Sequence, residues 1–334
     1  MTDASLSLPA RAFDLPRSLS AEARKVLANA YANRKPAPFP SLDDPDAWIS
    51  FVAEREALIS PMVDAFVAAP GATSERLDMG GASVWLCSPD VRQEHRPKAI
   101  YQIHGGGWVF GRGSITHAIT KLMAISTGCN VYGVDYRMPP EHPYPTPLDD
   151  CLAGYRAMLD RFAPADILIA GQSAGGNLAA ALMLQIRDTG LPAPAALFLD
   201  TPAVDLTMAS DSLYTNEGLD SAIGIADLQG GFLYAGRAAL DHPYVSPIYG
   251  DLSTGFPPTY LRTGTRDLLL SDTVRFHTAL RKAGVSADLY VVEGMPHGGF
   301  DGTTAATTED QEARADLLRW ISLHFNDNGS ANAA

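Results

Sequence analysis

The sequence predicts an α/β protein in which a mostly parallel sheet is covered by helices on both faces. After residue 80, short apolar runs typical of buried strands alternate with amphipathic, helix-like runs. Residues 1–70 instead contain helix-like runs with no strand between them, and residues 205–250 interrupt the later alternation. We therefore expect one sheet domain with two additional segments packed against it.

Residues 1–70 are predicted to form an N-terminal helical cap. Residues 18–35 begin with serines, which favour helix N-termini, and continue with good helix formers. Residues 46–69 repeat apolar residues at helical spacing.

Residues 71–204 and 251–326 are predicted to form the sheet domain. The expected strands lie within 82–88, 98–105, 129–136, 166–172, 195–201, 257–264 and 287–294. The expected helices lie within 117–127, 147–162, 175–188, 271–284 and 309–325. Residues 205–250 hold one helix-like run, 225–236, among turn-forming residues, and are predicted to be an insertion that joins the cap. Residues 327–334 are predicted to be a flexible tail.

Composition excludes several classes of function. The 334 residues are 46% hydrophobic and carry a formal charge of −13, which disfavours binding to nucleic acid. No apolar run approaches the roughly 18 residues of a membrane span, and the N-terminus does not resemble a signal peptide, so a cytoplasmic protein is expected. Cys87, Cys129 and Cys151 form neither a disulfide framework nor a metal-binding pattern, and buried thiols are expected.

A candidate nucleophile lies at residues 171–175, which read Gly-Gln-Ser-Ala-Gly. This G-x-S-x-G pattern is a weak signal alone, because an ordinary glycine-rich turn can match it. Here a strand-like run precedes it and an alanine-rich helix-like run follows, as required for a strained turn that exposes a serine hydroxyl. Ser173 is therefore the predicted nucleophile.

A serine nucleophile needs a base and an acid that orients the base. His297 follows the last strand-like run, at the sheet edge where ligands bind in this class of fold. Asp267 follows the preceding strand-like run and gives the chain order Ser, Asp, His. Asp272 begins the next helix and is interpreted as a helix cap, and Glu293 lies four residues before His297; both are weaker candidates for the acid.

A run of three glycines follows the strand-like residues 98–103, in the order His-Gly-Gly-Gly-Trp. Glycine lets backbone N–H groups approach a substrate closely, and acyl transfer needs such donors where negative charge develops on oxygen. A dinucleotide-binding loop is the alternative, but Thr116 stands where its third glycine is required. His104 is predicted to hold the loop, and Trp108 to anchor it or to line the pocket. The candidate oxyanion-hole donors are Gly105, Gly106, Gly107 and Ala174.

From about Ala82 to Phe325 the chain resembles the hormone-sensitive-lipase-like (bacterial family IV) carboxylesterases of the α/β-hydrolase superfamily. The motifs that carry the resemblance are "HGGGW", "DYRMPPEHPYPTPLDD", "GQSAGGNLAA", "HPYVSPIYGDL", "TGTRDLLLSD" and "GMPHGGF". The resemblance implies a helical cap over an eight-stranded sheet and hydrolysis of short acyl esters with neither cofactor nor metal. It places nucleophile, acid and base on Ser173, Asp267 and His297.

The resemblance also implies that Asp135, Arg137 and Glu141 brace the glycine loop as structural residues. The chain departs from the common family pattern at Gln172, where an acidic residue is usual, and at Leu268, where proline is frequent.

The predicted function is that of a serine carboxylesterase acting on short-chain acyl esters through a Ser-His-Asp triad and an acyl-enzyme intermediate. The alternative is a lactone hydrolase of the monoterpene ε-lactone type with the same triad. A non-catalytic small-molecule receptor on this fold is the remote alternative. The expected partners are an ester or lactone substrate and, because dimers are frequent in the family, a second copy of the chain.

Trp108 and Phe232 are the candidate pocket residues. Further apolar positions of the predicted cap could line the pocket, although packing between helices is the competing interpretation. These positions are Trp48, Phe51, Met62 and Phe66.

Overall fold

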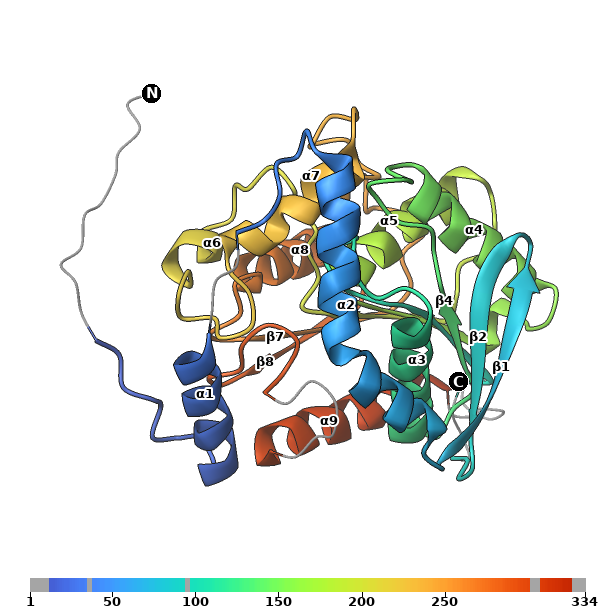
Figure 1. The fold of residues 1–334 in the computed structure, drawn as a ribbon. Helices are drawn as coiled ribbons and strands as arrows, with labels where there is room; N and C mark the ends of the chain where they lie inside the picture. Colours follow the sequence, from blue (N-terminus) through green and yellow to red (C-terminus); the bar gives the residue numbers. More distant parts are fainter. Residues whose placement is uncertain (1–11, 35–37, 94–96, 301–306, 326–334) are drawn as a thin grey trace.

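The computed structural model describes residues 12–34, 38–93, 97–300 and 307–325, and the tail predicted at 327–334 lies outside them. Within the described residues the chain forms one sheet of eight strands (Figure 1). The strands are β1 (Ala72–Met79), β2 (Ala82–Pro89), β3 (Ala99–Ile103), β4 (Val131–Val134), β5 (Ile167–Gln172), β6 (Ala196–Asp200), β7 (Thr259–Gly264) and β8 (Ala287–Val292).

The strands are ordered β1-β2-β4-β3-β5-β6-β7-β8. The pairs β1/β2 and β2/β4 are antiparallel and the remaining pairs are parallel. The carboxyl ends of the parallel strands therefore meet at one edge, where a ligand site is expected. All seven strand-like runs became strands. β1 was not predicted, because it is largely exposed and polar and pairs only with β2 at the sheet edge.

Helices connect most of the strands. The α-helices are α1 (Ala21–Asn33), α2 (Pro45–Ala68), α3 (Ser114–Thr127), α4 (Thr146–Leu159), α5 (Ala174–Asp188), α6 (Ser212–Thr215), α7 (Gln229–Ala235), α8 (Leu270–Lys282) and α9 (Thr308–Phe325). Short 3₁₀ turns lie at η1 (Pro164–Asp166), η2 (Ile225–Leu228) and η3 (Pro247–Tyr249).

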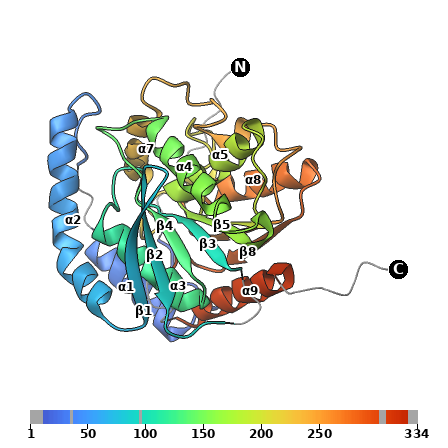
Figure 2. The ribbon, with the colours of Figure 1, turned by 90° about the vertical axis from the view of Figure 1, so that its right-hand side faces the viewer.

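The helices form a layer on each face of the sheet (Figure 2). On one face, α4, α5 and α8 pack against alternate strand residues such as Tyr101, Ile169 and Leu199. On the other face, α3 and α9 cover the intervening residues, among them Ile100 and Phe198. Because both faces are buried, the inner strands are mostly apolar on both faces, which explains their hydrophobic runs.

The N-terminal helices lie outside these two layers. The α1 residues Ala23 and Leu27 pack against Met295 and Phe300, close to the end of β8. Figure 2 shows α2 along one side of the molecule, and it packs against α3. The buried ammonium group of Lys121 on α3 donates to backbone carbonyls at the α2 C-terminus, Val67 among them. This cation supplies partners for the last carbonyls of α2.

The 205–250 segment contacts both N-terminal helices. The Tyr31 hydroxyl donates to the carbonyl of Leu219, and the Arg34 guanidinium donates to the carbonyl of Asp220 at 2.8 Å. Leu233 of α7 packs on the cluster formed by Trp48 and its neighbours on α2. The inserted segment and the N-terminal helices therefore enclose the same region of the sheet edge.

The cysteines and the apolar character of the helices were the two remaining points of the sequence analysis. The thiols of Cys87, Cys129 and Cys151 are free and buried. Across the part of the chain that the structure describes, no helix combines the length and the apolar character needed to cross a membrane.

Candidate active site

Ser173 lies in a sharp turn between β5 and α5. Its backbone has φ 55° and ψ −121°, a conformation that L-residues rarely adopt, and its N–H donates to the Asp200 carbonyl at 2.9 Å. A Cβ on Gly171 would lie 2.3 Å from the carbonyl oxygen of Gly175, and one on Gly175 would lie 2.1 Å from that of Ile103. Both glycines are therefore required by backbone contact, and the turn has the form expected of a nucleophile elbow.

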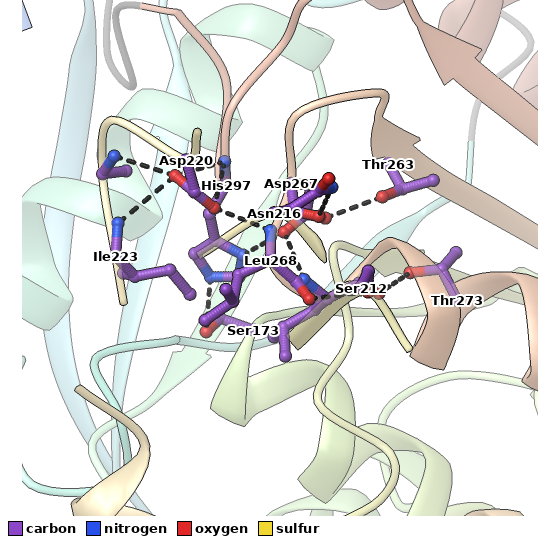
Figure 3. Close-up of polar contacts among 12 residues, drawn as sticks. Ser173, Ser212, Asn216, Asp220, Ile223, Thr263, Asp267, Leu268, Thr273 and His297 are labelled. Carbon is purple, nitrogen blue, oxygen red and sulfur yellow. Dashed lines mark hydrogen bonds and ion pairs between the residues drawn. The ribbon is translucent and has the colours of Figure 1, made fainter. Parts of the chain in front are cut away.

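His297 links the side chains of Ser173 and Asp267 (Figure 3). Its Nε2 lies 2.8 Å from Ser173 Oγ, and its Nδ1 lies 3.0 Å from Asp267 Oδ1. The three residues come from the loops after β5, β7 and β8, so the shared sheet edge brings them together. This hydrogen-bonded chain can draw the hydroxyl proton toward the imidazole and make the serine oxygen nucleophilic.

The Asp267 carboxylate is fully buried and held on both oxygens. Oδ1 accepts from the Leu269 N–H at 2.9 Å, and Oδ2 accepts from the Thr263 hydroxyl at 2.7 Å. Asp272, one of the two weaker candidates, accepts from the backbone N–H of Asp205 and from the Ser210 hydroxyl. The interpretation of Asp272 as a helix cap was wrong, because its carboxylate joins the 205–210 segment to α8; its burial raises its pKa to about 7.

Opposing effects act on the pKa of His297. Burial disfavours the imidazolium ion, but the negative charge and hydrogen bond of Asp267 favour it, as do the charges of Asp220 and Asp200. The carboxylates outweigh burial, so the pKa of His297 lies above its usual value. The site is therefore arranged to stabilise the imidazolium that forms when a serine proton is taken up.

The glycine run packs directly on the serine turn. A Cβ on Gly105 would lie 2.9 Å from the Gln172 carbonyl oxygen, and one on Gly106 would lie 2.2 Å from that of Phe110. Gly106 also has φ 110°, a conformation that favours glycine. Among the described residues, the backbone N–H groups of Gly106, Gly107 and Ala174 donate to no protein acceptor. These groups can therefore donate to a substrate oxygen beside Ser173.

His104 lies beneath this loop and is buried. Its Nδ1 is 2.7 Å from the Gly105 carbonyl oxygen, and its ring stacks on Tyr136 with centroids 4.3 Å apart. Tyr136 also donates its hydroxyl hydrogen to the His104 carbonyl at 3.0 Å. Tyr136 is thus a supporting residue that the sequence analysis missed, although it lies between Asp135 and Arg137 in a motif that had been identified.

The three residues predicted to brace the loop have different partners. Asp135 accepts from the Gly113 N–H at 2.9 Å, and Glu141 lies 3.7 Å from Arg112, so both contact the segment just after the glycine run. Arg137 instead pairs with Asp150 of α4 at 2.7 Å. The Arg137 side chain therefore ties this segment to the helix layer, and its support of the glycine loop stays a prediction.

A cleft of about 1340 Å³ opens above Ser173 and His297. The glycine run, Trp108, residues of α1 and α2 and the 217–228 segment line it, with Trp48 and Phe51 among the α2 residues. Trp108 is almost fully buried and stacks on Tyr234 at 5.5 Å, so it both anchors the loop and lines the cleft. The prediction that Phe232 lines the substrate pocket was wrong, because Phe232 lines a separate hollow beside α7.

The sequence analysis also missed three polar residues behind the site. The side chains of Ser212, Asn216 and Asp220 all contact the backbone beside Asp267, and Asp220 also contacts the His297 N–H (Figure 3). Their spacing of four residues was the available signal. It was hidden among the turn-forming residues of 205–250.

No group of three or more His, Cys, Asp or Glu side chains that could hold a metal ion occurs among the residues whose positions are described.

Comparisons with known proteins agree with this geometry. A family model described as alpha/beta hydrolase fold matches residues 100–301. An esterase of Acinetobacter venetianus is 35% identical over 231 residues, which cover 68% of this chain and 76% of that protein. The carboxylesterase NlhH of Mycobacterium tuberculosis is 35% identical over 225 residues, covering 63% and 68% respectively.

Solved structures give the same result. The crystal structure of an esterase named E25 has a TM-score of 0.86 and 32% identity, and the match covers 96% of this chain and 99% of that one. An esterase from the bacterial hormone-sensitive lipase family has a TM-score of 0.77 and 28% identity, with 92% and 99% covered. The chain therefore belongs to the α/β-hydrolase family, among the hormone-sensitive-lipase-like esterases, and is a carboxylic ester hydrolase.

Proposed function

We propose that this chain is a serine carboxylesterase that hydrolyses short-chain acyl esters through Ser173, His297 and Asp267. The observation that carries the proposal is the unbroken hydrogen-bonded chain from Ser173 Oγ through His297 to Asp267, at 2.8 Å and 3.0 Å, on the floor of the cleft. Nucleophile, base and orienting acid are the three parts that acyl transfer by serine requires.

In the first half-reaction, Ser173 Oγ attacks the ester carbonyl carbon while its proton passes to His297 Nε2. Asp267 accepts the Nδ1–H of His297, which selects the neutral tautomer with a free Nε2 and then stabilises the imidazolium. The carbonyl oxygen becomes an oxyanion, for which the N–H groups of Gly106, Gly107 and Ala174 are the candidate donors.

The tetrahedral intermediate then expels the alcohol, which takes its proton from His297 and leaves the acyl group on Ser173. In the second half-reaction, His297 removes a proton from water, the hydroxide attacks the acyl carbon, and the carboxylic acid departs as Ser173 recovers its hydrogen. Each proton taken by His297 is returned, so the residues of the site end each cycle in their starting states.

Acyl-chain length is the variable for the first experiment. The family resemblance implies short acyl groups, whereas the cleft of about 1340 Å³ exceeds the roughly 300–1000 Å³ of common ligand pockets. We would measure kcat/KM for p-nitrophenyl esters from acetate to palmitate, with ε-caprolactone in parallel and Ser173→Ala as the control.

The proposal predicts a maximum between acetate and hexanoate and loss of hydrolysis in Ser173→Ala. A maximum at palmitate would contradict the short-chain preference. Preferential cleavage of ε-caprolactone would favour the lactone hydrolase instead. Undiminished hydrolysis by Ser173→Ala would show that the nucleophile is wrongly assigned.

A further inference from the structure

The segment 212–223 carries three polar side chains, four residues apart, that contact the loop holding Asp267. The Ser212 hydroxyl donates to the Leu268 carbonyl at 2.7 Å, and Asn216 Nδ2 donates to the Asp267 carbonyl at 2.8 Å. Both side chains are buried. Two backbone carbonyls beside the candidate acid are therefore fixed by side chains of this segment, which is remote from them in the sequence.

Asp220, the third of these residues, contacts both the loop of the acid and the loop of the base (Figure 3). It is fully buried, and its Oδ2 lies 2.8 Å from the Leu268 N–H and 3.3 Å from the His297 N–H. Its Oδ1 accepts from the N–H groups of Ala222 at 2.8 Å and Ile223 at 3.3 Å. Every one of these partners is a donor, so they satisfy a carboxylate and leave no acceptor for a protonated acid.

The same residue is joined to the substrate cleft. The residues that follow it, Ser221, Ala222 and Ile223, line the cleft. On the other side, Arg34, the residue directly after α1, donates to the backbone carbonyls of Asp220 and Ile223. Asp220 therefore lies where the cleft wall, α1 and the two loops of the triad meet.

We propose that Asp220 is a positioning residue for ester hydrolysis, whose carboxylate aligns the His297 loop with the Asp267 loop and places a second negative charge beside His297. This inference rests on the proposed function of Ser173, His297 and Asp267. Asp220 has no contact with Ser173 and takes no proton in the reaction, so its effect on the rate is exerted through His297.

Three carboxylates act on the imidazole of His297. Asp267 binds Nδ1 directly, and Asp220 binds the backbone N–H. Asp200 acts from the end of β6, where Arg262 pairs with it at 2.6 Å. Asp220 favours the imidazolium without a cation paired to its carboxylate among the described residues. Removing its charge should therefore lower the pKa of His297.

The test is the pH dependence of kcat/KM for p-nitrophenyl butyrate in the full chain carrying Asp220→Asn. His297 must be neutral to accept the serine proton, so activity rises with pH through its pKa. A lower pKa moves the acidic limb of the profile to lower pH. We also expect kcat on the plateau to fall about tenfold, with KM changed less, because the alignment of His297 is disturbed.

Asp211→Asn is the matched control. It makes the same change of charge in the residue before Ser212, at an exposed carboxylate that has no hydrogen bond or ion pair within the described part of the chain. Its profile should superimpose on that of the wild type. Asp220→Glu retains the negative charge and both acceptor oxygens, and it should restore the acidic limb even where plateau kcat stays low.

An acidic limb unchanged in Asp220→Asn would overturn the proposal, as would failure of both Asp220 variants to fold, which would assign the residue to folding alone. Thermal unfolding and circular dichroism distinguish these results. The outcome is separable from that for the proposed function, because activity retained in Ser173→Ala would reject the nucleophile, whereas the Asp220 profiles are read only against an active wild type and control.

Discussion

Two segments hold the proposed catalytic residues in place, and they do so by different means. The serine turn, residues 171–175, is shaped by backbone contacts that only glycine permits, such as that between Gly175 and Ile103. The 212–223 segment acts through side chains, because Asn216 and Asp220 bind backbone groups of remote loops. Close backbone packing holds Ser173, the proposed nucleophile, whereas side-chain hydrogen bonds hold the loops of the proposed acid and base.

The difference predicts different consequences of mutation. Filling space in the serine turn forces backbone atoms apart, which costs stability and activity together. Removing a side chain from the 212–223 segment introduces no clash, so the backbone can keep its position. The lost hydrogen bonds loosen the alignment of His297. Four substitutions test this contrast. The first is at His297, which contacts both Ser173 of the serine turn and Asp220 of the 212–223 segment.

The largest effect is expected for His297→Ala. Without the base, the Ser173 hydroxyl is not activated, and kcat/KM for p-nitrophenyl butyrate should fall by at least about 10⁴-fold. His242→Ala is the control: this histidine accepts from the Tyr244 N–H at 3.1 Å, outside the cleft, and its activity should stay within about twofold of the wild type. A loss below tenfold in His297→Ala would contradict the assignment of the base.

Asp267→Asn should reduce kcat by about 10³- to 10⁴-fold. The amide can bind Nδ1 as a donor and so favours the tautomer in which Nε2 carries the hydrogen and cannot accept from Ser173. Comparing the kcat of Asp267→Asn with that of Asp272→Asn distinguishes the two candidate acids. Asp272 contacts the 205–210 segment, so its replacement should reduce kcat less. Greater loss of kcat in Asp272→Asn would reverse the assignment of the acid.

Gly175→Ala should lower the free energy of unfolding by about 3 kcal/mol and abolish most activity, because its Cβ would meet two backbone carbonyls. Alanine gains at most about 1 kcal/mol in helix propensity, which the clash outweighs. Chemical denaturation measures the free energy of unfolding, and p-nitrophenyl ester hydrolysis measures the activity. The control is Gly190→Ala, where φ is 70° and the surrounding space is open, so a cost of only about 1 kcal/mol is expected. Equal costs at the two positions would argue against close packing in the serine turn.

The smallest effect is expected for Asn216→Ala, which removes donors to the carbonyls of Thr265 and Asp267. Stability should fall by about 1–2 kcal/mol, while kcat/KM falls about tenfold. Asn29→Ala changes the same side chain at an exposed position of α1 and should alter neither quantity appreciably. If Asn216→Ala lost stability but kept full activity, the 212–223 segment would be a structural support without influence on the triad.

The contrast also explains what could be predicted from the sequence. Patterns that depend on neighbouring residues were informative. Buried parallel strands are mostly apolar on both faces, and a strand-to-helix turn around Ser173 needs glycine on both sides. Chain order then singled out Asp267 and His297, since successive parallel strands bring their following loops to one edge.

The remainder depended on contacts between remote residues. β1 is an exposed edge strand whose polar residues carry no alternation that the sequence could reveal. Whether Arg137 reaches the glycine loop or Asp150, and whether Phe232 faces the cleft or another hollow, depends on side-chain direction after packing. Asp220 was missed for the same reason, because its partners at Leu268 and His297 are brought to it only by the fold.

The most direct test of the central claim is the site of covalent modification by diethyl p-nitrophenyl phosphate, an organophosphate that phosphorylates an activated serine with release of p-nitrophenol. Intact-mass and peptide mass spectrometry should find one diethylphosphoryl group per chain, on Ser173, together with stoichiometric loss of ester hydrolysis. The Ser173→Ala protein should acquire none. An inactivated enzyme modified at another residue, or full hydrolysis in a chain phosphorylated at Ser173, would contradict the assignment of the nucleophile.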